Sequence, residues 1–225
     1  MYLPAHFEEH RPGELQRVLR EHPLGALITH SPHGLDANHI PFELDEATGP
    51  HGTLRAHVAR ANPVWREVPA DGAEVLVIFQ ASDAYISPNW YPSKPEHHRH
   101  VPTWNYQVVH AHGRLRVVDD ERFVRGLVAR LTREHEHRSQ QASLWKMGDS
   151  APEFITGLLQ AIVGIEIEIT RLVGKSKLGQ NREARDRLGA AAGVEGLGNT
   201  PAAMAMRQAA SGKRQAASEL TPSTR

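Results

Sequence analysis

Cysteine is absent from the sequence, so a disulfide framework, a cysteine nucleophile and a thiolate zinc site are all excluded. No apolar run reaches the length of about eighteen residues that a membrane-spanning helix needs. The first ten residues also lack the apolar stretch of a signal peptide. The sequence therefore predicts a cytoplasmic protein with no membrane partner.

An excess of charge of either sign is also missing, because 26 Lys and Arg residues balance 26 Asp and Glu residues. This balance provides no general attraction to nucleic acid. Histidine is abundant, with 15 residues, and invites a metal hypothesis. However, His135 and His137 are two residues apart and cannot share a helix face, and no His-Glu-x-x-His motif occurs. No metal site is predicted.

Hydrophobic periodicity predicts a mainly β chain with flanking helices (α+β). Alternating or β-branched runs predict strands at residues 24–30, 35–44, 53–58, 73–80, 84–87, 103–118 and 165–170. Helical spacing predicts helices at 12–21, 121–138 and 151–161, and Asn62-Pro63 is typical of a further helix start. Because no parallel strand–helix–strand units and no Gly-x-Gly-x-x-Gly motif occur, an antiparallel barrel is favoured over a Rossmann sheet.

The composition changes near the end of the chain. The stretch 189–225 is rich in Ala, Gly, Ser and Thr and can bury little apolar surface. We expect one folded domain over residues 1–188 and a weakly structured appendage over 189–225, with a short Ala-rich helix around 201–210.

The first candidate site lies in residues 54–63, where a strand is predicted to run into a helix start. Arg55, His57 and Arg60 surround this junction, and Asn62 would cap the helix. Free N–H groups at a helix start, together with arginines, bind phosphate groups. The alternative interpretation is a solvated strand end with exposed arginines.

The second candidate site is aromatic. Most of the chain's Trp and Tyr residues gather in segments 84–91 and 101–106, and the latter places Trp104 between Thr103 and Asn105. Aromatic faces interleaved with polar groups suit a flat ring system with polar edges. A hydrophobic core with a polar rim is the alternative.

The third candidate is the basic run 174–182, which contains Lys175, Lys177 and Arg182. These cations could neutralise a phosphate or a nucleic-acid backbone, or lie on a solvated surface. The run is not a Walker loop. A Ser–His–Asp hydrolase of the α/β type also lacks support, since no Gly-x-Ser-x-Gly elbow occurs.

Taken together, six ordered segments resemble the PaiB-type family of FMN-binding negative transcriptional regulators. The matching segments are residues 1–7, 38–42, 54–63, 84–91, 101–106 and 174–182. The resemblance implies an antiparallel split β-barrel related to pyridoxamine-phosphate oxidases, with FMN as cofactor and a homodimer with the flavin at its interface. The chain departs from the family pattern at Ala56, usually Gly, and at Gly179, usually Ser.

The resemblance also implies roles for the candidate residues. Arg55 and Arg60, with Lys175 or Lys177, would hold the phosphate, while His57, Trp104 and Asn105 would line the ring or the ribityl chain. Asn62 and Thr103 complete the predicted cofactor-binding set. No catalytic residue is assigned.

The function implied is an FMN-binding sensor or negative transcriptional regulator. DNA is a further candidate partner, supported by the family name and by the basic stretch 171–187. A flavin-dependent oxidoreductase and a haem-handling split-barrel enzyme are the alternatives, so whether the protein is an enzyme stays open.

Overall fold

A computed structural model describes residues 1–219, leaving aside the side chains of His97 and of residues 210–219. Within this range the chain divides into two compact units, which we describe separately. The terminal unit contains Met1–Glu14, Gln80–Val109 and residues 173–219. The central unit contains Leu15–Phe79 and His110–Leu172.

The described helices are α1 (Pro12–Glu21), α2 (Lys94–His97), α3 (Glu121–Arg138), α4 (Pro152–Gln160), α5 (Ala184–Gly196) and α6 (Thr200–Glu219). Short 3-10 helices lie at η1 (Ala5–Phe7), η2 (Pro63–Trp65), η3 (Pro88–Trp90) and η4 (Met147–Asp149). The strands are β1 (Glu8–Glu9), β2 (Leu24–Ser31), β3 (Gly34–Pro41), β4 (Glu43–Asp45), β5 (Thr53–Ala59), β6 (Ala73–Ile86), β7 (Thr103–Val118) and β8 (Ile162–Lys177). None of the described helices combines the length and apolar character needed to cross a membrane.

The strands form one sheet in the order β3-β2-β6-β7-β8-β5-β4, and β1 pairs with β8. The recorded pairings, such as β2 with β3 and β5 with β8, are antiparallel. Over the described residues the sheet is not closed, and β3 and β4 are its edge strands. The predicted fold class, an antiparallel split barrel with flanking helices, is confirmed.

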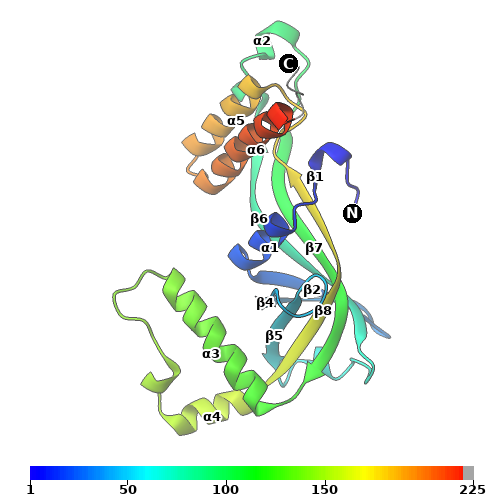
Figure 1. The fold of residues 1–225 in the computed structure, drawn as a ribbon, viewed down its shortest axis with the longest axis vertical. Helices are drawn as coiled ribbons and strands as arrows, with labels where there is room; N and C mark the ends of the chain where they lie inside the picture. Colours follow the sequence, from blue (N-terminus) through cyan, green and yellow to red (C-terminus); the bar gives the residue numbers. More distant parts are fainter. Residues whose placement is uncertain (220–225) are drawn as a thin grey trace, which may run out of the picture. The chain divides into compact units, whose positions relative to one another are not determined.

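The core of the central unit follows from strand alternation. On β8, Ile165, Ile167 and Ile169 are at most 1% exposed, whereas Glu168 on the opposite face is exposed. Successive side chains of a strand point to opposite faces, so one face of this strand is buried and the other is polar. Figure 1 shows α3 and α4 of this unit as neighbouring helices, and they share a small apolar cluster built on Val124, Ile155 and Leu159.

The boundaries of α1, α3 and β7 coincide with the predicted ones. Two strands predicted at 73–80 and 84–87 are instead the single strand β6, because the polar residues between them continue the strand. Gln80 donates to Asp83 along it at 2.8 Å. The predicted strand 35–44 is interrupted at Phe42, which separates β3 from β4.

Helices α5 and α6 lie side by side in the terminal unit (Figure 1). Two glycines of α5 allow a close approach: a Cβ at Gly193 would lie 2.3 Å from the Trp90 ring, and one at Gly189 would lie 2.3 Å from the Trp90 carbonyl oxygen. Small buried residues such as Ala191 and Ala203 complete this packing.

The structure therefore differs from the weak structure expected after residue 188. Residues 189–196 belong to α5, and α6 includes the helix expected around 201–210. Residues 220–225 of the predicted appendage lie outside the described residues. The division into a domain ending at 188 and an appendage stays a prediction.

Candidate functional site

In the central unit, the first predicted anion-binding residue already has two acidic partners. Arg55 lies on β5, and its guanidinium pairs with Asp45 at 2.9 Å and with Glu166 at 2.8 Å. Glu166 is the residue of β8 that faces Arg55 in the antiparallel register. Because two carboxylates neutralise this cation, a phosphate could bind it only by displacing one of them.

Arg60 is also fully engaged. Its guanidinium forms a two-pronged pair with Asp119 at 2.7 and 2.8 Å, and it donates to the carbonyl oxygens of Gln160 and Ile162. The hydrogen bond with Asp119 raises the pKa of Arg60 and lowers the pKa of Asp119. These contacts fasten the end of β5 to the segments at 119 and 160–162.

Asn62 has the capping role that the sequence predicts. Its side-chain oxygen accepts the Val64 N–H at 3.0 Å, and its amide donates to Asn38 at 2.7 Å. The helix that it caps is one 3-10 turn, η2, rather than a longer α-helix. The Val64 N–H is therefore used by the cap, and this helix start provides no array of free donors for a phosphate.

His57 is partly buried on β5, and its Nδ1 atom is buried without a hydrogen-bond partner. Burial lowers the pKa of His57, so the neutral imidazole is favoured. Facing it on β8 is Gly164, where a Cβ would lie 2.6 Å from the Phe123 ring of α3. Ala56, which replaces the family's Gly, is fully buried in the core.

In the terminal unit, Thr103 and Trp104 begin β7. The Lys177 ammonium donates to the Thr103 hydroxyl at 2.7 Å, and Asn105 is buried. Trp104 is 55% exposed and meets Tyr85 of β6 edge to face, with ring centroids 6.0 Å apart. The aromatic pair and the lysine–threonine pair thus share the start of β7, where the adjacent residues Thr103 and Trp104 extend to opposite faces of the strand.

Lys175 is the most buried of the predicted cations, at 8% exposed. Its ammonium donates to the Tyr2 carbonyl oxygen at 3.1 Å and lies 5.4 Å from the centroid of the Tyr106 ring. Among the described residues, no carboxylate lies within ion-pair distance of Lys175 or Lys177. These two lysines are therefore available to bind an anion, whereas Arg55 and Arg60 are already paired with carboxylates.

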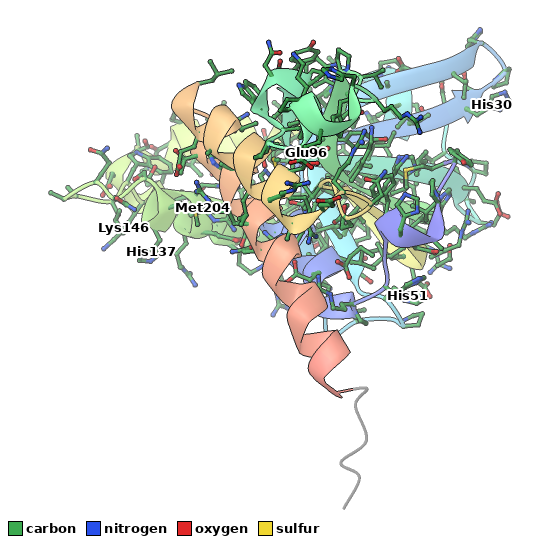
Figure 2. All side chains as sticks on the ribbon, turned by 90° about the horizontal axis from the view of Figure 1, so that it is seen from above. His30, His51, Glu96, His137, Lys146 and Met204 are labelled. Atoms are coloured by element: carbon green, nitrogen blue, oxygen red, sulfur yellow. The ribbon has the colours of Figure 1, made fainter. Side chains whose placement is uncertain are left out.

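A buried polar cluster, which the sequence analysis missed, joins the segment 93–100 to the start of α5. Ser93 Oγ lies 2.6 Å from Asp186 Oδ2 and 2.8 Å from His100 Nε2, and Arg182 lies 3.2 Å from His100 Nδ1. No sequence signal could have linked residues 93 and 186, because their distance along the chain hides the contact. Glu96, labelled in Figure 2, reinforces the same join by pairing with Arg185 of α5 at 2.5 Å.

The hydrogen-bond directions show what this cluster does. Arginine can only donate, so His100 Nδ1 accepts from Arg182 and the ring proton is assigned to Nε2. His100 then donates to the Ser93 hydroxyl, which donates to Asp186. In a Ser–His–Asp triad the hydroxyl donates to the histidine instead. The cluster therefore fastens the segment and does not activate Ser93.

Histidines do not gather into a metal centre. Within the described part of the chain, no group of three or more His, Asp or Glu side chains is placed to hold a metal ion. His137, labelled in Figure 2, belongs to α3 and follows Glu136, whose carboxylate accepts the Trp145 N–H at 2.9 Å.

An open antiparallel sheet with flanking helices is the architecture that this chain shares with flavin-binding split barrels. The chain belongs to the family described as "Putative FMN-binding domain", whose model matches residues 1–171. Its cofactor is FMN. By their chemistry, lysines without a carboxylate partner suit a phosphate, and an exposed aromatic face suits a flat ring.

The relatives agree with this assignment. Protease synthase and sporulation protein PAI 2 of Bacillus subtilis is 31% identical over 186 residues, which cover 83% of this chain and 85% of the relative. An uncharacterized protein of Emericella nidulans is 33% identical over 230 residues, which cover 88% of this chain and 92% of that protein. The predicted PaiB-type resemblance is therefore confirmed.

Two solved structures share the fold. An FAD and heme binding protein from Mycobacterium smegmatis gives a TM-score of 0.53 at 17% identity, covering 81% of this chain and 79% of its own. A flavocytochrome from Azotobacter vinelandii gives a TM-score of 0.50 at 13% identity, covering 77% of this chain and 70% of its own. At these identities the likeness concerns the fold alone.

Proposed function

We propose that this FMN-binding protein is a flavin-dependent sensor that acts as a negative transcriptional regulator, and that Lys175, Lys177 and Thr103 hold the phosphate of FMN. The observation that carries the site is that neither lysine forms an ion pair within the part of the chain that the structure describes. Both lie at the end of β8 without a carboxylate partner among the described residues. A phosphate monoester carries a charge of about −1.5 to −2 at neutral pH and accepts strong hydrogen bonds from such groups.

The remaining predicted residues take different roles in this proposal. Trp104 and Asn105, which follow Thr103 on β7, would bind the ring or ribityl side. Arg55 and Arg60 would support β5 through their ion pairs, and direct contact with the phosphate would require those pairs to break. FMN supplies the redox chemistry, and the protein binds and orients it and excludes water.

The regulatory role is supported by the relative from Bacillus subtilis, whose name connects it with protease synthesis and sporulation. The protein would be a homodimer, as the family resemblance implies, and cytoplasmic, as the sequence predicts. Size-exclusion chromatography with light scattering tests the dimer, and cell fractionation tests the location. DNA stays a candidate partner, and its binding should weaken steeply as salt concentration rises.

The site is tested by titrating the purified protein with FMN and recording the flavin absorption bands after gel filtration. We expect the unaltered protein to retain FMN and the Lys175→Met and Lys177→Met variants to retain much less. Lys146, labelled in Figure 2, is an exposed lysine of the central unit, so Lys146→Met is the matched control. Equal retention by all three variants would refute the proposed phosphate site.

A further inference from the structure

The first residues of the chain cover the buried cation of the proposed site. Besides its 3.1 Å hydrogen bond to the Tyr2 carbonyl, the Lys175 ammonium lies 5.9 Å from the centroid of the Tyr2 ring. A backbone carbonyl and two aromatic rings, those of Tyr2 and Tyr106, are thus the partners of a lysine that is 8% exposed. We call residues 1–4 the N-terminal strap.

The strap forms few hydrogen bonds of its own. Its hydrogen bonds in the described structure are the one from Lys175 to Tyr2 and the one from the Phe7 N–H to the Pro4 carbonyl, at 2.9 Å. The Tyr2 side chain is 84% exposed, whereas Phe7, after the strap, is buried. Strand β1 then pairs Glu8 with Lys175 and Glu9 with Gly174. The strap can therefore detach while Phe7 and β1 keep their places.

A phosphate is a stronger partner for Lys175 than the Tyr2 carbonyl. An ammonium has three donors, and here one neutral acceptor is recorded for it. A charged phosphate oxygen forms a shorter hydrogen bond, roughly twice as strong as a neutral one. Lys175 is only 8% exposed, and its ammonium lies against the backbone and ring of Tyr2. A phosphate therefore reaches this ammonium by taking the place of Tyr2, and the two compete for the same position.

We infer that binding of a phosphate ester at Lys175 releases the N-terminal strap, so that occupancy of the flavin site is reported by exposure of residues 1–4. This inference rests on the proposed phosphate site, and release of the strap would be the structural response to binding there. Coupling of this kind is reciprocal: the factor by which FMN loosens the strap equals the factor by which the strap weakens FMN binding. A ligand without the phosphate has no such differential affinity and leaves the strap in place.

Hydrogen exchange of the peptide covering residues 1–10 tests the release, measured on the full chain with FMN, riboflavin or inorganic phosphate. We expect faster exchange with FMN and with phosphate, and no change with riboflavin. If bound FMN leaves exchange unchanged, or if riboflavin accelerates it equally, the strap inference is overturned while FMN binding stands. If no FMN binds at all, the proposed function fails, and inorganic phosphate alone still tests the strap.

Two variants sharpen the test. Deletion of residues 2–4 should tighten FMN binding about tenfold, within the usual range of coupling between sites, and unchanged or weaker binding would contradict the inference. Lys175→Met should give fast strap exchange that FMN and phosphate no longer alter. Lys94→Met is the control, because Lys94 is an exposed lysine of the same unit that donates to Asn89. In Lys94→Met, FMN should accelerate hydrogen exchange of the strap as it does in the unaltered protein, and loss of this acceleration would overturn the inference.

Discussion

The Lys177 ammonium donates a 2.7 Å hydrogen bond to the Thr103 hydroxyl and joins the end of β8 to the start of β7. This pair unites two segments, 101–106 and 174–182, that the sequence offers as separate candidates. A hydroxyl that accepts from the ammonium keeps its own proton free to donate to an anion. Thr103 and Lys177 can therefore bind the same phosphate oxygen or neighbouring ones.

Replacing Lys177 by Met should weaken FMN binding about 10- to 100-fold, because a hydrogen bond to a charged group contributes roughly 1.5–3 kcal/mol. Thr103→Val should weaken it about tenfold, since it removes one hydroxyl that donates to the charged phosphate. Titration of flavin fluorescence measures both effects. Riboflavin binding should change little in either variant, and an equal loss of riboflavin and FMN would show that the pair supports the ring and not the phosphate.

Gly193 should not tolerate a side chain. A Cβ there would lie 2.3 Å from the Trp90 ring, so Gly193→Ala must displace either α5 or the indole. We expect Gly193→Ala to destabilise the fold by about 1–3 kcal/mol, the usual cost of overpacking. A Cβ at Gly196, in the same helix, would have no neighbouring atom within 4 Å, so Gly196→Ala should be neutral or slightly stabilising. Urea denaturation of the two variants measures the difference, and equal midpoints would contradict the packing argument.

These glycines show why the sequence predicts the central unit better than helix α5 of the terminal unit. The Ile165, Ile167 and Ile169 alternation is a local pattern, and the structure buries all three. Gly189 and Gly193 carry no apolar side chain, so their stretch looks unable to pack. These glycines contribute to packing because they allow α5 to approach Trp90 closely. Trp90 lies about a hundred residues earlier, and only the folded chain brings it against them.

The sequence also predicts only part of the candidate site, namely the types of residue but not their partners. Residue types single out the cations as a group, but their partners decide what each can do. Arg60 and Lys177 look equally suited to a phosphate in the sequence, yet Arg60 is paired with Asp119 and Lys177 with a hydroxyl. Such pairing arises from strand register and loop closure, which periodicity does not contain. Sequence resemblance supplied the cofactor, and the structure supplied the partners of each cation.

His57 should make stability depend on pH. Burial lowers its pKa in the folded protein below the ordinary 6.5, so the unfolded chain binds the proton more tightly. The contribution of neutral His57 to the free energy of unfolding is then complete above pH 6.5, and it falls as the pH drops from 6.5 through the folded-state pKa. His57→Leu should make this fall less steep in urea denaturation at a series of pH values. The exposed His51, labelled in Figure 2, gives the control His51→Gln, and an equal change of slope in both variants would contradict the prediction.

Asp186 should be a stabilising residue of the terminal unit because its carboxylate accepts from both the backbone N–H and the hydroxyl of Ser93, at 3.1 and 2.6 Å. Asp186→Ala leaves those buried donors without their acceptor, at a cost of about 1–3 kcal/mol. Asp186→Asn keeps one acceptor oxygen and should cost less. Glu183→Ala is the control, since Glu183 is exposed and solvent screens its pair with Arg185.

Urea denaturation near pH 7 should rank the stability of these variants, with Asp186→Ala the least stable and Glu183→Ala close to the unaltered protein. Burial would raise the pKa of Asp186, but the two Ser93 hydrogen bonds outweigh it and hold the pKa below 3.8. The carboxylate is therefore charged near neutral pH, and its contribution is lost only as the pH falls from 3.8 through the folded-state value. If Asp186→Ala proves as mild as Glu183→Ala, the Ser93 contact does not fasten the 93–100 segment to α5, and the pair of Glu96 with Arg185 would have to do so instead.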